Sequence, residues 1–328
     1  MSTAAAPAPP CFADIERAAR RLSGQAVSTP LLAPPALVPV VGTNVLVKAE
    51  SLQRTGSFKF RGAYNKLCTL SPGERARGVI AYSSGNHAQG VAEAARLLGV
   101  DATIVMPEDA PPLKLARTRA SGATVVVYDR YRQDRRALAE DIAARSGRVM
   151  IPPFDDPEII AGQGTVGLEI ARQCAGLGVA PAAVLVPCGG GGLTAGVGIA
   201  LRTLQPASEI YAVEPEAFDD TRRSLAAGRR LANPSDARSI CDALLGEPSE
   251  LTFTINRRLV SGVLTVSDDA VRDAMELAFR ELKLVAEPSG IVGLAALLEG
   301  GLKDAGGPVV LVLSGGNVDP GFYRRVLA

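Results

Sequence analysis

The sequence predicts an α/β protein with two open parallel sheets and helices on both faces of each sheet. Apolar runs rich in Val and Ile recur along the whole chain, and stretches with helical periodicity separate them. Strands that are apolar throughout and alternate with helices are typical of parallel sheets covered on both sides. The length of 328 residues, 47% of them hydrophobic, suits a globular chain of about two domains.

The expected elements follow that alternation in order. The expected strands are residues 45–48, 79–82, 102–106, 124–128, 183–187, 210–213 and 309–313. The expected helices include residues 87–98, 113–120, 134–145, 160–173, 270–282 and 291–298. The stretch IPPFDDP at 151–157 carries three prolines and two aspartates, which favours a crossing between domains. We therefore expect a small domain at residues 78–151 and a large domain formed by residues 1–77 and 152–328.

Composition narrows the function classes. Lys and Arg number 35 against 34 for Asp and Glu, which argues against nucleic acid and anionic membranes as partners. The N-terminal MSTAAAPAPP has neither the basic residue nor the apolar core of a secretory signal, so we expect a disordered tip. The cysteines are odd in number and form no CxxC pair, which predicts a reducing cytoplasm; they are Cys11, Cys68, Cys174, Cys188 and Cys241.

The uncharged stretch at 173–201 is long enough on paper to span a bilayer. Pro181, Pro187 and four consecutive glycines at 189–192 interrupt it, and a spanning helix would break there. We interpret the stretch as a buried strand, a glycine loop and a helix.

The glycine loop predicts an anion site, since bare backbone amides and a helix N-terminus suit a phosphate. No GK[ST] follows the glycines, so the loop is not a nucleoside-triphosphate P-loop. A dinucleotide site remains an alternative: Gly190, Gly192 and Ala195 fit GxGxxA, and Glu214 ends the next strand, where a ribose-binding acid belongs. The glycines alone cannot choose between a nucleotide and another phosphorylated cofactor.

The stretch TGSFKFRGA at 55–63 places a lysine in an unfavourable position. Ser57 is expected to cap a helix, and Lys59 would then oppose the helix dipole between two phenylalanines. Desolvation and the positive helix end should lower the pKa of the Lys59 amine, which suits a nucleophile that forms Schiff bases. The alternative is an ordinary solvated lysine.

A second loop, SSGNHAQG at 83–90, joins a strand to a helix and carries hydroxyl and amide donors that suit a carboxylate. His87 is the only histidine of the chain. A Ser-His-Asp hydrolase without a GxSxG motif, or a metal site with several histidines, therefore has little support.

Four motifs in order along the chain resemble the fold-type II pyridoxal-phosphate (PLP) enzymes, whose architecture is like that of the tryptophan synthase β subunit. They are KAESLQRTGSFKFRGA (48–63), SSGNHAQG (83–90), PCGGGGL (187–193) and LSGGN (313–317). The resemblance is closest to the serine/threonine dehydratase and serine racemase branch. It implies that the large domain binds PLP and that the small domain lies on the substrate side.

The resemblance also implies roles for individual residues. Lys59 would form the internal aldimine, Phe58 would back the pyridine ring, and the glycine loop would hold the phosphate through its amides. Asn86 would bind the 3-hydroxyl of the cofactor, and Ser314 would face the pyridine nitrogen. The full set of implied cofactor residues is Phe58, Lys59, Asn86, Gly189, Gly190, Gly191, Gly192, Leu193, Glu287 and Ser314.

For the substrate, the resemblance implies that the freed Lys59 acts as general base at Cα. Ser84 matches the acid/base residue that racemases of this family use on the opposite face. Arg135 matches an arginine near the racemase pocket and could clamp a second carboxylate, or it could lie on a solvated helix face. The implied substrate residues are Ser83, Ser84, Asn86, His87 and Arg135.

A divalent-cation site is also implied, in the stretch EPEAFDD. Glu214, the carbonyl of Phe218 and Asp220 would supply hard oxygen ligands for Mg²⁺, or for Ca²⁺ or Mn²⁺. The alternative is an acidic, solvated turn. Ala243 departs from the family, which often has glycine at that position near the cofactor.

The sequence thus favours a cytoplasmic, homodimeric dehydratase that converts L-threonine or L-serine to a 2-oxo acid and ammonia. A 3-hydroxyaspartate dehydratase or a serine racemase is the first alternative, and a nicotinamide-dependent oxidoreductase is a more distant one. Little sequence follows LSGGN, so we expect no regulatory domain like that of biosynthetic threonine deaminases.

Overall fold

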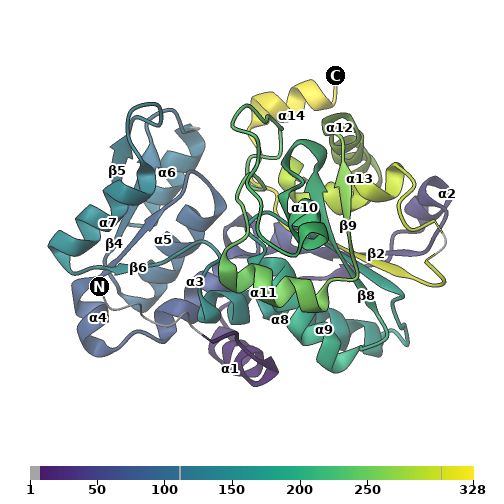
Figure 1. Ribbon diagram of the computed structural model, residues 1–328, viewed down its shortest axis with the longest axis horizontal. Coiled ribbons are helices and arrows are strands. Elements are labelled where there is room, and N and C mark those ends of the chain that lie inside the picture. The colour runs from purple at the N-terminus through teal and green to yellow at the C-terminus, as the bar shows by residue number, and fades with distance from the viewer. Residues whose placement is uncertain (1–7, 111, 304) are drawn as a thin grey trace.

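The computed structural model describes residues 8–110, 112–303 and 305–328, and it contains two separate sheets (Figure 1). One sheet has six strands in the order β1-β2-β10-β7-β8-β9, and the other has four in the order β5-β4-β3-β6. The expected disordered tip falls largely on residues 1–7, which lie outside the described residues. The α/β class with parallel sheets and flanking helices is confirmed.

The four-stranded sheet is formed by residues 79–150. Its strands, all parallel, are β3 (Val79–Tyr82), β4 (Ala102–Pro107), β5 (Thr124–Tyr128) and β6 (Val149–Met150). The intervening helices are α5 (Asn86–Leu98), α6 (Pro112–Ala120) and α7 (Arg135–Ser146). Every residue of β4 is buried, as a central strand covered on both faces requires. The carboxyl ends of β3, β4 and β5 therefore meet at one edge, where α/β sheets bind ligands.

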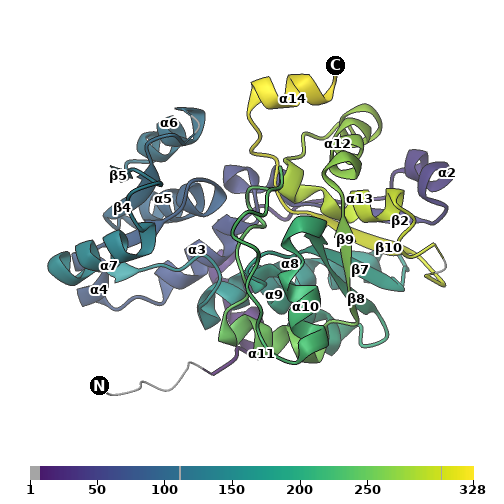
Figure 2. The same ribbon diagram turned by 45° about the horizontal axis from the view of Figure 1, so that its top comes forward.

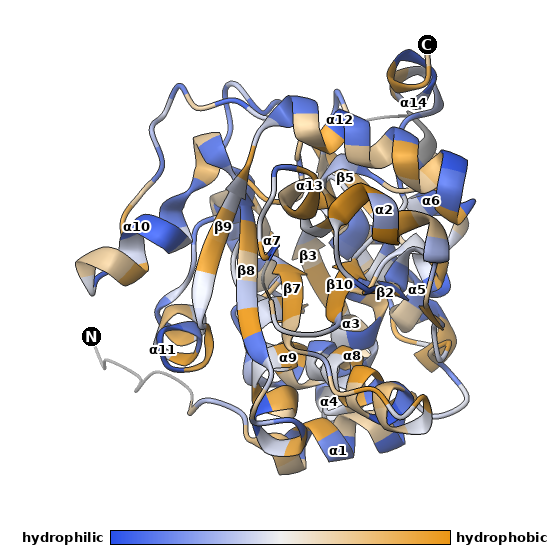
Figure 3. Cartoon of the chain, turned by 90° about the vertical axis from the view of Figure 1, so that its right-hand side faces the viewer, coloured by the Kyte–Doolittle hydropathy of each residue, from blue (hydrophilic) through white to orange (hydrophobic). Residues whose placement is uncertain are grey.

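The six-stranded sheet carries the larger core. Its strands are β1 (Leu31–Leu32), β2 (Val45–Ala49), β7 (Ala183–Pro187), β8 (Glu209–Pro215), β9 (Gly262–Val266) and β10 (Val309–Leu313). Only β1 pairs antiparallel. All residues of β2, β7 and β10 are buried, and Figure 3 shows β7 and β10 as hydrophobic strands between helices above and below.

Helices cover both faces of this sheet. They include α8 (Pro157–Gly176), α9 (Gly192–Leu204), α12 (Asp268–Leu277) and α13 (Val292–Leu298). The other helices are α1 (Phe12–Leu22), α2 (Val38–Val41), α3 (Lys59–Cys68), α4 (Pro72–Arg77), α10 (Asp220–Ala227), α11 (Glu250–Leu259) and α14 (Pro320–Val326). Figure 2 shows α3 and α8 between the two sheets.

Two local predictions are wrong. Helix α12 ends at Leu277, and a π-helix, Ala278–Leu282, follows where a single helix to 282 was expected. Ser57 does not cap α3: its backbone is extended (φ −164°, ψ 160°) and the cap position is Phe58, without a side-chain hydrogen bond. Ser57 is instead bridged to Gly315, so a contact with a distant segment overrides the local capping preference.

In the part of the chain that the structure describes, no helix is both long and apolar enough to cross a bilayer. The glycine loop inside the uncharged stretch does join a strand to a helix, β7 to α9, as expected. The division into a small domain at 78–151 and a large domain stays a prediction.

Candidate active site

Lys59 is the first residue of α3 and lies in partly buried surroundings. Its Nζ donates a hydrogen bond of 2.8 Å to the carbonyl of Pro153 and lies 5.1 Å from the centre of the Phe58 ring. Desolvation lowers the pKa of the Lys59 amine to about 8, and the Glu287 carboxyl opposes this shift. A fraction of the amine is therefore unprotonated near neutral pH, as a nucleophile or base requires.

The segment before Lys59 lies against the LSGGN loop. The Phe58 amide donates to the Ser314 carbonyl at 3.1 Å, and Ser57 forms an isolated antiparallel bridge with Gly315. Ser314 is buried with 4% exposure. Two motifs more than 250 residues apart in sequence thus meet at the start of α3.

The glycine loop joins β7 to α9 with very little space around its backbone. Gly191 has φ +80°, which disfavours a side chain. A Cβ added at Gly190 would lie 2.3 Å from the Phe154 ring, and one at Gly189 would lie 3.0 Å from the Leu244 Cα. The loop is a backbone cradle at the N-terminus of a 13-residue helix, and such a cradle fits a phosphate.

The serine-asparagine loop joins β3 to α5. Ser83 Oγ accepts a hydrogen bond of 3.2 Å from the Gly85 amide. His87 Nε2 contacts the Ile151 carbonyl at 2.9 Å, so Nε2 carries the proton, and Nδ1 is buried with no partner among the described residues. Burial, with a contribution from the Lys59 charge, lowers the pKa of His87 to about 3. His87 is therefore neutral, and its ring can only accept a further hydrogen bond.

A chain of polar side chains connects three of the motif loops. Asn86 Nδ2 donates to Glu287 Oε1 at 2.5 Å, and Asn317 Nδ2 donates to Asn86 Oδ1 at 2.9 Å and to the Thr55 carbonyl at 2.7 Å. Burial raises the pKa of Glu287 to about 8, with a smaller contribution from Asp242. Asn86 and Glu287, both predicted cofactor residues, therefore lie in direct contact.

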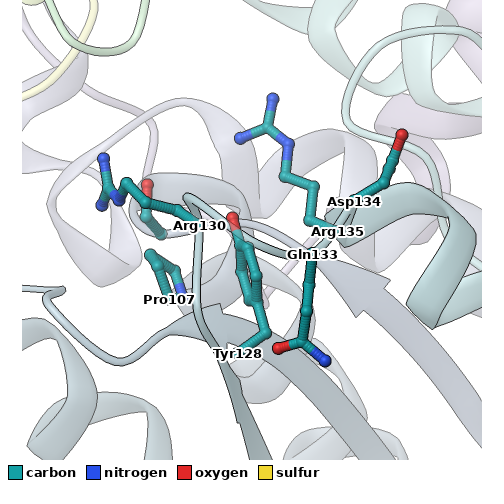
Figure 4. Close-up of a pocket in the computed structure, with 7 residues that line it drawn as sticks. Pro107, Tyr128, Arg130, Gln133, Asp134 and Arg135 are labelled. Carbon is teal, nitrogen blue, oxygen red and sulfur yellow. The ribbon is translucent and has the colours of Figure 1, made fainter.

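A pocket of about 330 Å³ opens at the carboxyl edge of the four-stranded sheet (Figure 4). It is lined by Ser84, Pro107, Tyr128, Arg130, Gln133, Asp134 and Arg135. The structure thus brings together two predicted substrate residues, Ser84 and Arg135, from different elements.

The two arginines of this pocket differ in their partners. Arg130 Nε donates to Asp109 Oδ1 at 2.8 Å. The Arg135 side chain is exposed, has no carboxylate partner among the described residues, and lies 5.9 Å from the centre of the Tyr82 ring. Asp134 also lines the pocket and caps α7; the amides of Ala137 and Arg136 and, more weakly, the Arg135 charge lower the pKa of its carboxyl. Arg135 nevertheless makes no direct carboxylate contact among the described residues.

The predicted cation site lies at the end of β8. Glu214 is fully buried, and its two oxygens accept from the Thr221 and Arg222 amides, each at 3.0 Å. Asp220 accepts from Asn233 at 2.6 Å through Oδ1, whereas its Oδ2 is buried without a partner. Burial is the first cause that raises the pKa of Glu214 to about 7 and that of Asp220 to about 6. The unpartnered Oδ2 of Asp220, in a buried region that also holds the Glu214 carboxyl, fits a divalent cation.

Phe218 lies between these acids in the short helix Glu216–Phe218. Within the described residues, no group of three His, Cys, Asp or Glu side chains gathers as metal ligands. A cation at Glu214 and Asp220 would therefore need backbone carbonyls or water as further ligands. Ala243, the departure from the family, donates its amide to Ser289 Oγ at 2.9 Å.

Three residues of the site carry no assigned role in the sequence analysis. Pro153 holds Lys59 through a backbone carbonyl, and Phe154 packs on the glycine loop. The sequence could not predict the Pro153 contact, because every residue has a backbone carbonyl. It could not predict the Phe154 contact, because the surrounding IPPFDDP has the composition of a linker. Asn317 is the last residue of the LSGGN motif, and its place in that motif could have identified it as a site residue.

The chain matches a family model described as pyridoxal-phosphate dependent enzyme over residues 22–315. It is 43% identical over 316 residues to an L-threo-3-hydroxyaspartate ammonia-lyase of a Pseudomonas species, covering 96% of this chain and 98% of that protein. It is 40% identical over 315 residues to an L-threonine ammonia-lyase of Thermotoga maritima, covering 96% of this chain and 77% of that protein.

Among solved structures, maize serine racemase superposes with a TM-score of 0.92 at 34% identity and with 97% of each chain covered. The match decides between the two interpretations of the glycine loop, since the family uses pyridoxal phosphate and not a dinucleotide. The chain belongs to the family of pyridoxal-phosphate dependent enzymes.

Proposed function

We propose that this enzyme is an ammonia-lyase for β-hydroxy amino acids and that its preferred substrate is a 3-hydroxyaspartate. The observation that carries the proposal is Arg135, an arginine without a carboxylate partner among the described residues, in the same pocket as Ser84. The Pseudomonas relative named for L-threo-3-hydroxyaspartate supports the same substrate class. The products would be a 2-oxo acid and ammonia.

The residues present fit the cofactor. The backbone cradle at Gly189, Gly190, Gly191, Gly192 and Leu193 would hold the phosphate, and Lys59 would attach the cofactor covalently. Phe58 would lie behind the ring, Asn86 and Glu287 would contact its polar edge, and Ser314 would face its nitrogen. When bound, pyridoxal phosphate stabilises the negative charge that develops at Cα of the attached amino acid.

The serine-asparagine loop would bind the α-carboxylate of the substrate. Ser83 and Ser84 offer hydroxyl donors, and the first amides of α5, at Asn86 and His87, have no helical partners. Since the His87 ring is neutral and donates to Ile151, His87 would contribute its backbone amide rather than its ring. The N-terminus of α5 adds a favourable dipole for a carboxylate.

Lys59 would move the proton at Cα. Its pKa of about 8 makes it a competent base near neutral pH, and the Pro153 carbonyl orients the amine when it is protonated. Ser84 lies on the side of the pocket with Arg135 and would serve as acid or base there. Loss of the β-hydroxyl then yields the dehydrated amino acid, which hydrolyses to the products.

Arg135 would bind the second carboxylate of the substrate. A guanidinium matches a carboxylate bidentately, whereas the methyl group of threonine or the hydrogen of serine would leave Arg135 unpaired. Hydrogen bonds to a charged group contribute about 1.5 to 3 kcal/mol, which corresponds to roughly 10- to 100-fold in kcat/KM.

The test is release of ammonia and 2-oxo acid from both 3-hydroxyaspartate diastereomers, L-threonine and L-serine. We expect a hydroxyaspartate to be turned over best, and Arg135→Ala to lower its kcat/KM about 100-fold with little effect on threonine. Arg136→Ala is the matched control, because Arg136 is the next residue and is paired with the exposed Glu140. Better turnover of threonine by the wild type, or an equal loss in both variants, would contradict the proposal.

A dehydratase for L-threonine or L-serine, with or without racemase activity, is the second candidate. The Thermotoga relative carries the first activity in its name and the maize structure the second. Ser84 in the substrate pocket supports racemisation, because a second acid/base group can protonate Cα on the opposite face. Chiral analysis of unreacted serine after incubation would detect it.

We also propose that Glu214, Asp220 and the Phe218 carbonyl bind Mg²⁺ or a similar divalent cation. The unpartnered Asp220 oxygen supports this proposal.

We further propose a homodimer, because apolar side chains are exposed around Arg280. Phe279 and Val285 line one hollow beside it, and Val40 lines a second hollow that Arg280 shares. Light scattering would give the mass of the assembly, and Val40→Asp should lower it to a monomer. Localisation in the cytoplasm and the domain boundaries at 78 and 151 are proposed with this function.

A further inference from the structure

A cluster of buried charged side chains lies outside the pocket and the cofactor cradle. The cluster, which we call the α3 clamp, consists of Lys48, Glu50, Arg61 and Glu169. Side-chain exposures are 0% for Lys48, 0% for Glu50, 1% for Arg61 and 20% for Glu169. Two cations balance two carboxylates, so the clamp carries no net charge.

Arg61 is the centre of the α3 clamp. Its Nε and Nη2 donate to Glu50, each at 2.8 Å, and its Nη1 and Nη2 donate to Glu169 at 2.7 and 2.9 Å. Nη1 also donates to Thr165 Oγ1 at 3.1 Å. The guanidinium thus forms two bidentate pairs at once, a geometry that a lysine ammonium cannot reproduce.

The remaining members connect the clamp to other segments. Lys48 Nζ donates to Glu169 Oε2 and to the Thr29 carbonyl, each at 2.6 Å, and to Gln173 Oε1 at 3.0 Å. Burial opposes ionisation of Glu50, but Arg61 holds its pKa below the usual value. Glu50 therefore stays ionised beside Arg61, and the hydrogen bonds of the clamp join the end of β2 to α3 and α8.

Arg61 and Lys59 lie in the same helical turn. Residues two apart on a helix project in directions about 200° apart, so Arg61 faces β2 and α8 while Lys59 faces the cofactor site. The same turn crosses α8 closely: a Cβ added at Gly162 would lie 2.6 Å from the Gly62 Cα. On its other side α8 meets α9, the helix that begins at the glycine loop, where a Cβ at Gly164 would lie 2.9 Å from the Gly196 carbonyl.

We propose that Arg61 is a positioning residue: its double fork to Glu50 and Glu169 fixes the first turn of α3, and with it the Lys59 amine, relative to the glycine loop. This turn needs such support because its cap residue makes no side-chain hydrogen bond and no acidic residue lies in it. Helix α8 contacts Arg61 on one side and packs against α9 on the other. It would therefore set the distance between the Lys59 amine and the glycine loop. The inference rests on the proposed role of Lys59.

The experiment measures how fast apoenzyme attaches pyridoxal phosphate, followed by absorbance, by borohydride trapping and by mass mapping of the labelled peptide. We expect Arg61→Lys to slow attachment at least tenfold and to shift the visible absorbance of the bound cofactor, with far-UV circular dichroism unchanged. Glu169→Gln keeps one oxygen for the fork and should slow attachment less. If Arg61→Lys does not fold, Glu169→Gln alone carries the test, with an expected slowing of at least threefold.

Arg202→Lys is the matched control. Arg202 also makes several hydrogen bonds, to the Leu259, Pro206 and Ser208 carbonyls and to Ser261, but it lies in the last turn of α9, away from α3. Wild-type rates in both clamp variants, or equal slowing in Arg202→Lys, would overturn the inference and leave the role of Lys59 intact. Label on a lysine other than Lys59 in the wild type would overturn both.

Discussion

The glycine loop and the serine-asparagine loop of the candidate site are built in different ways. Each joins a parallel strand to a helix and presents a helix N-terminus. The glycine loop has almost no free space, because Phe154, Leu244 and Asn256 close on its backbone. The serine-asparagine loop presents Ser84 to an open pocket. A closed backbone cradle suits a cofactor that stays bound, and adaptable side-chain donors suit a substrate that must enter and leave.

Replacement of Lys59 should have the largest effect on activity. Lys59→Ala should lower turnover about 1,000-fold or more, because both the covalent attachment and the base at Cα are lost. Cofactor should still bind without covalent attachment, since the glycine loop is unchanged. Product assays and borohydride trapping measure the two effects, and trapped label in the variant would contradict the assignment.

The pH dependence tests the amine without a mutation. With a pKa of about 8, the reactive, unprotonated fraction of Lys59 grows as pH rises, roughly tenfold per unit below pH 8, and levels off above it. Attachment of pyridoxal phosphate to apoenzyme should therefore accelerate about 50-fold between pH 6 and pH 8. A rate that continues to rise tenfold per unit well above pH 8 would show that the amine is not desolvated, because an ordinary lysine titrates near 10.5.

Ser84→Ala should separate the serine-asparagine loop from the glycine loop. Loss of a charge-assisted hydrogen bond to the substrate carboxylate should raise KM by about 10- to 100-fold. Cofactor affinity should stay within about twofold, because Ser84 lines the pocket at the edge of the four-stranded sheet and hydrogen bonds elsewhere are unchanged. Steady-state kinetics and cofactor titration give both numbers, and an equal loss in the two would mean that the loops are not independent.

Gly191→Ala should do the reverse. Its φ of +80° disfavours alanine, and the new Cβ would lie 2.6 Å from Asn256 Nδ2, so cofactor affinity should fall about tenfold. Gly228→Ala is the control, since Gly228 has φ +67° but no heavy atom within 4 Å of the added Cβ. Cofactor titration checks both, and an equal effect would mean that backbone strain alone, rather than the closed cradle, explains the result.

The smallest expected effect concerns the proposed cation site at Glu214 and Asp220. Glu214 has a folded pKa of about 7 against 4.5, so the folded state holds an extra proton in this window and stability falls as pH rises through it. A bound cation removes that penalty. Mg²⁺ should therefore raise the melting temperature by about 2 to 5 °C at pH 8 and less at pH 5.

Glu214→Gln should abolish the Mg²⁺ effect on the melting temperature. The glutamine keeps the shape of the side chain and removes its charge, so the pH-dependent penalty also disappears. Thermal scans of both proteins at the two pH values provide the comparison. A Mg²⁺ shift that survives in the variant would place the cation elsewhere.

The sequence predicts best those strands that are buried along their whole length. Residues 183–187 and 309–313 are buried throughout, and an unbroken apolar run identifies such strands. Strand β9, Gly262–Val266, was missed because four of its five residues are only half-buried and it begins with glycine. The π-helix at 278–282 was missed because the helical pattern of the sequence continues through it.

Within the candidate site, the residues that the sequence predicts belong to motifs with unusual chemistry, such as Lys59 and the four glycines; their roles stay predictions. The prediction for Ser57 failed because a local capping rule cannot include Gly315, which is distant in sequence. Pro153 acts through its carbonyl, and the orientation of a carbonyl is set by tertiary structure alone. A local sequence pattern can therefore predict which side chains are reactive, but it cannot predict their hydrogen-bond partners, which depend on the tertiary fold.

The segment at 151–154 has a consequence for motion. Its carbonyls accept from His87, which belongs to the four-stranded sheet, and from Lys59, and its Phe154 ring lies against the glycine loop. A displacement of this segment would therefore change the surroundings of the His87 ring, the Lys59 amine and the glycine loop at the same time. One short stretch of chain thus couples three parts of the site.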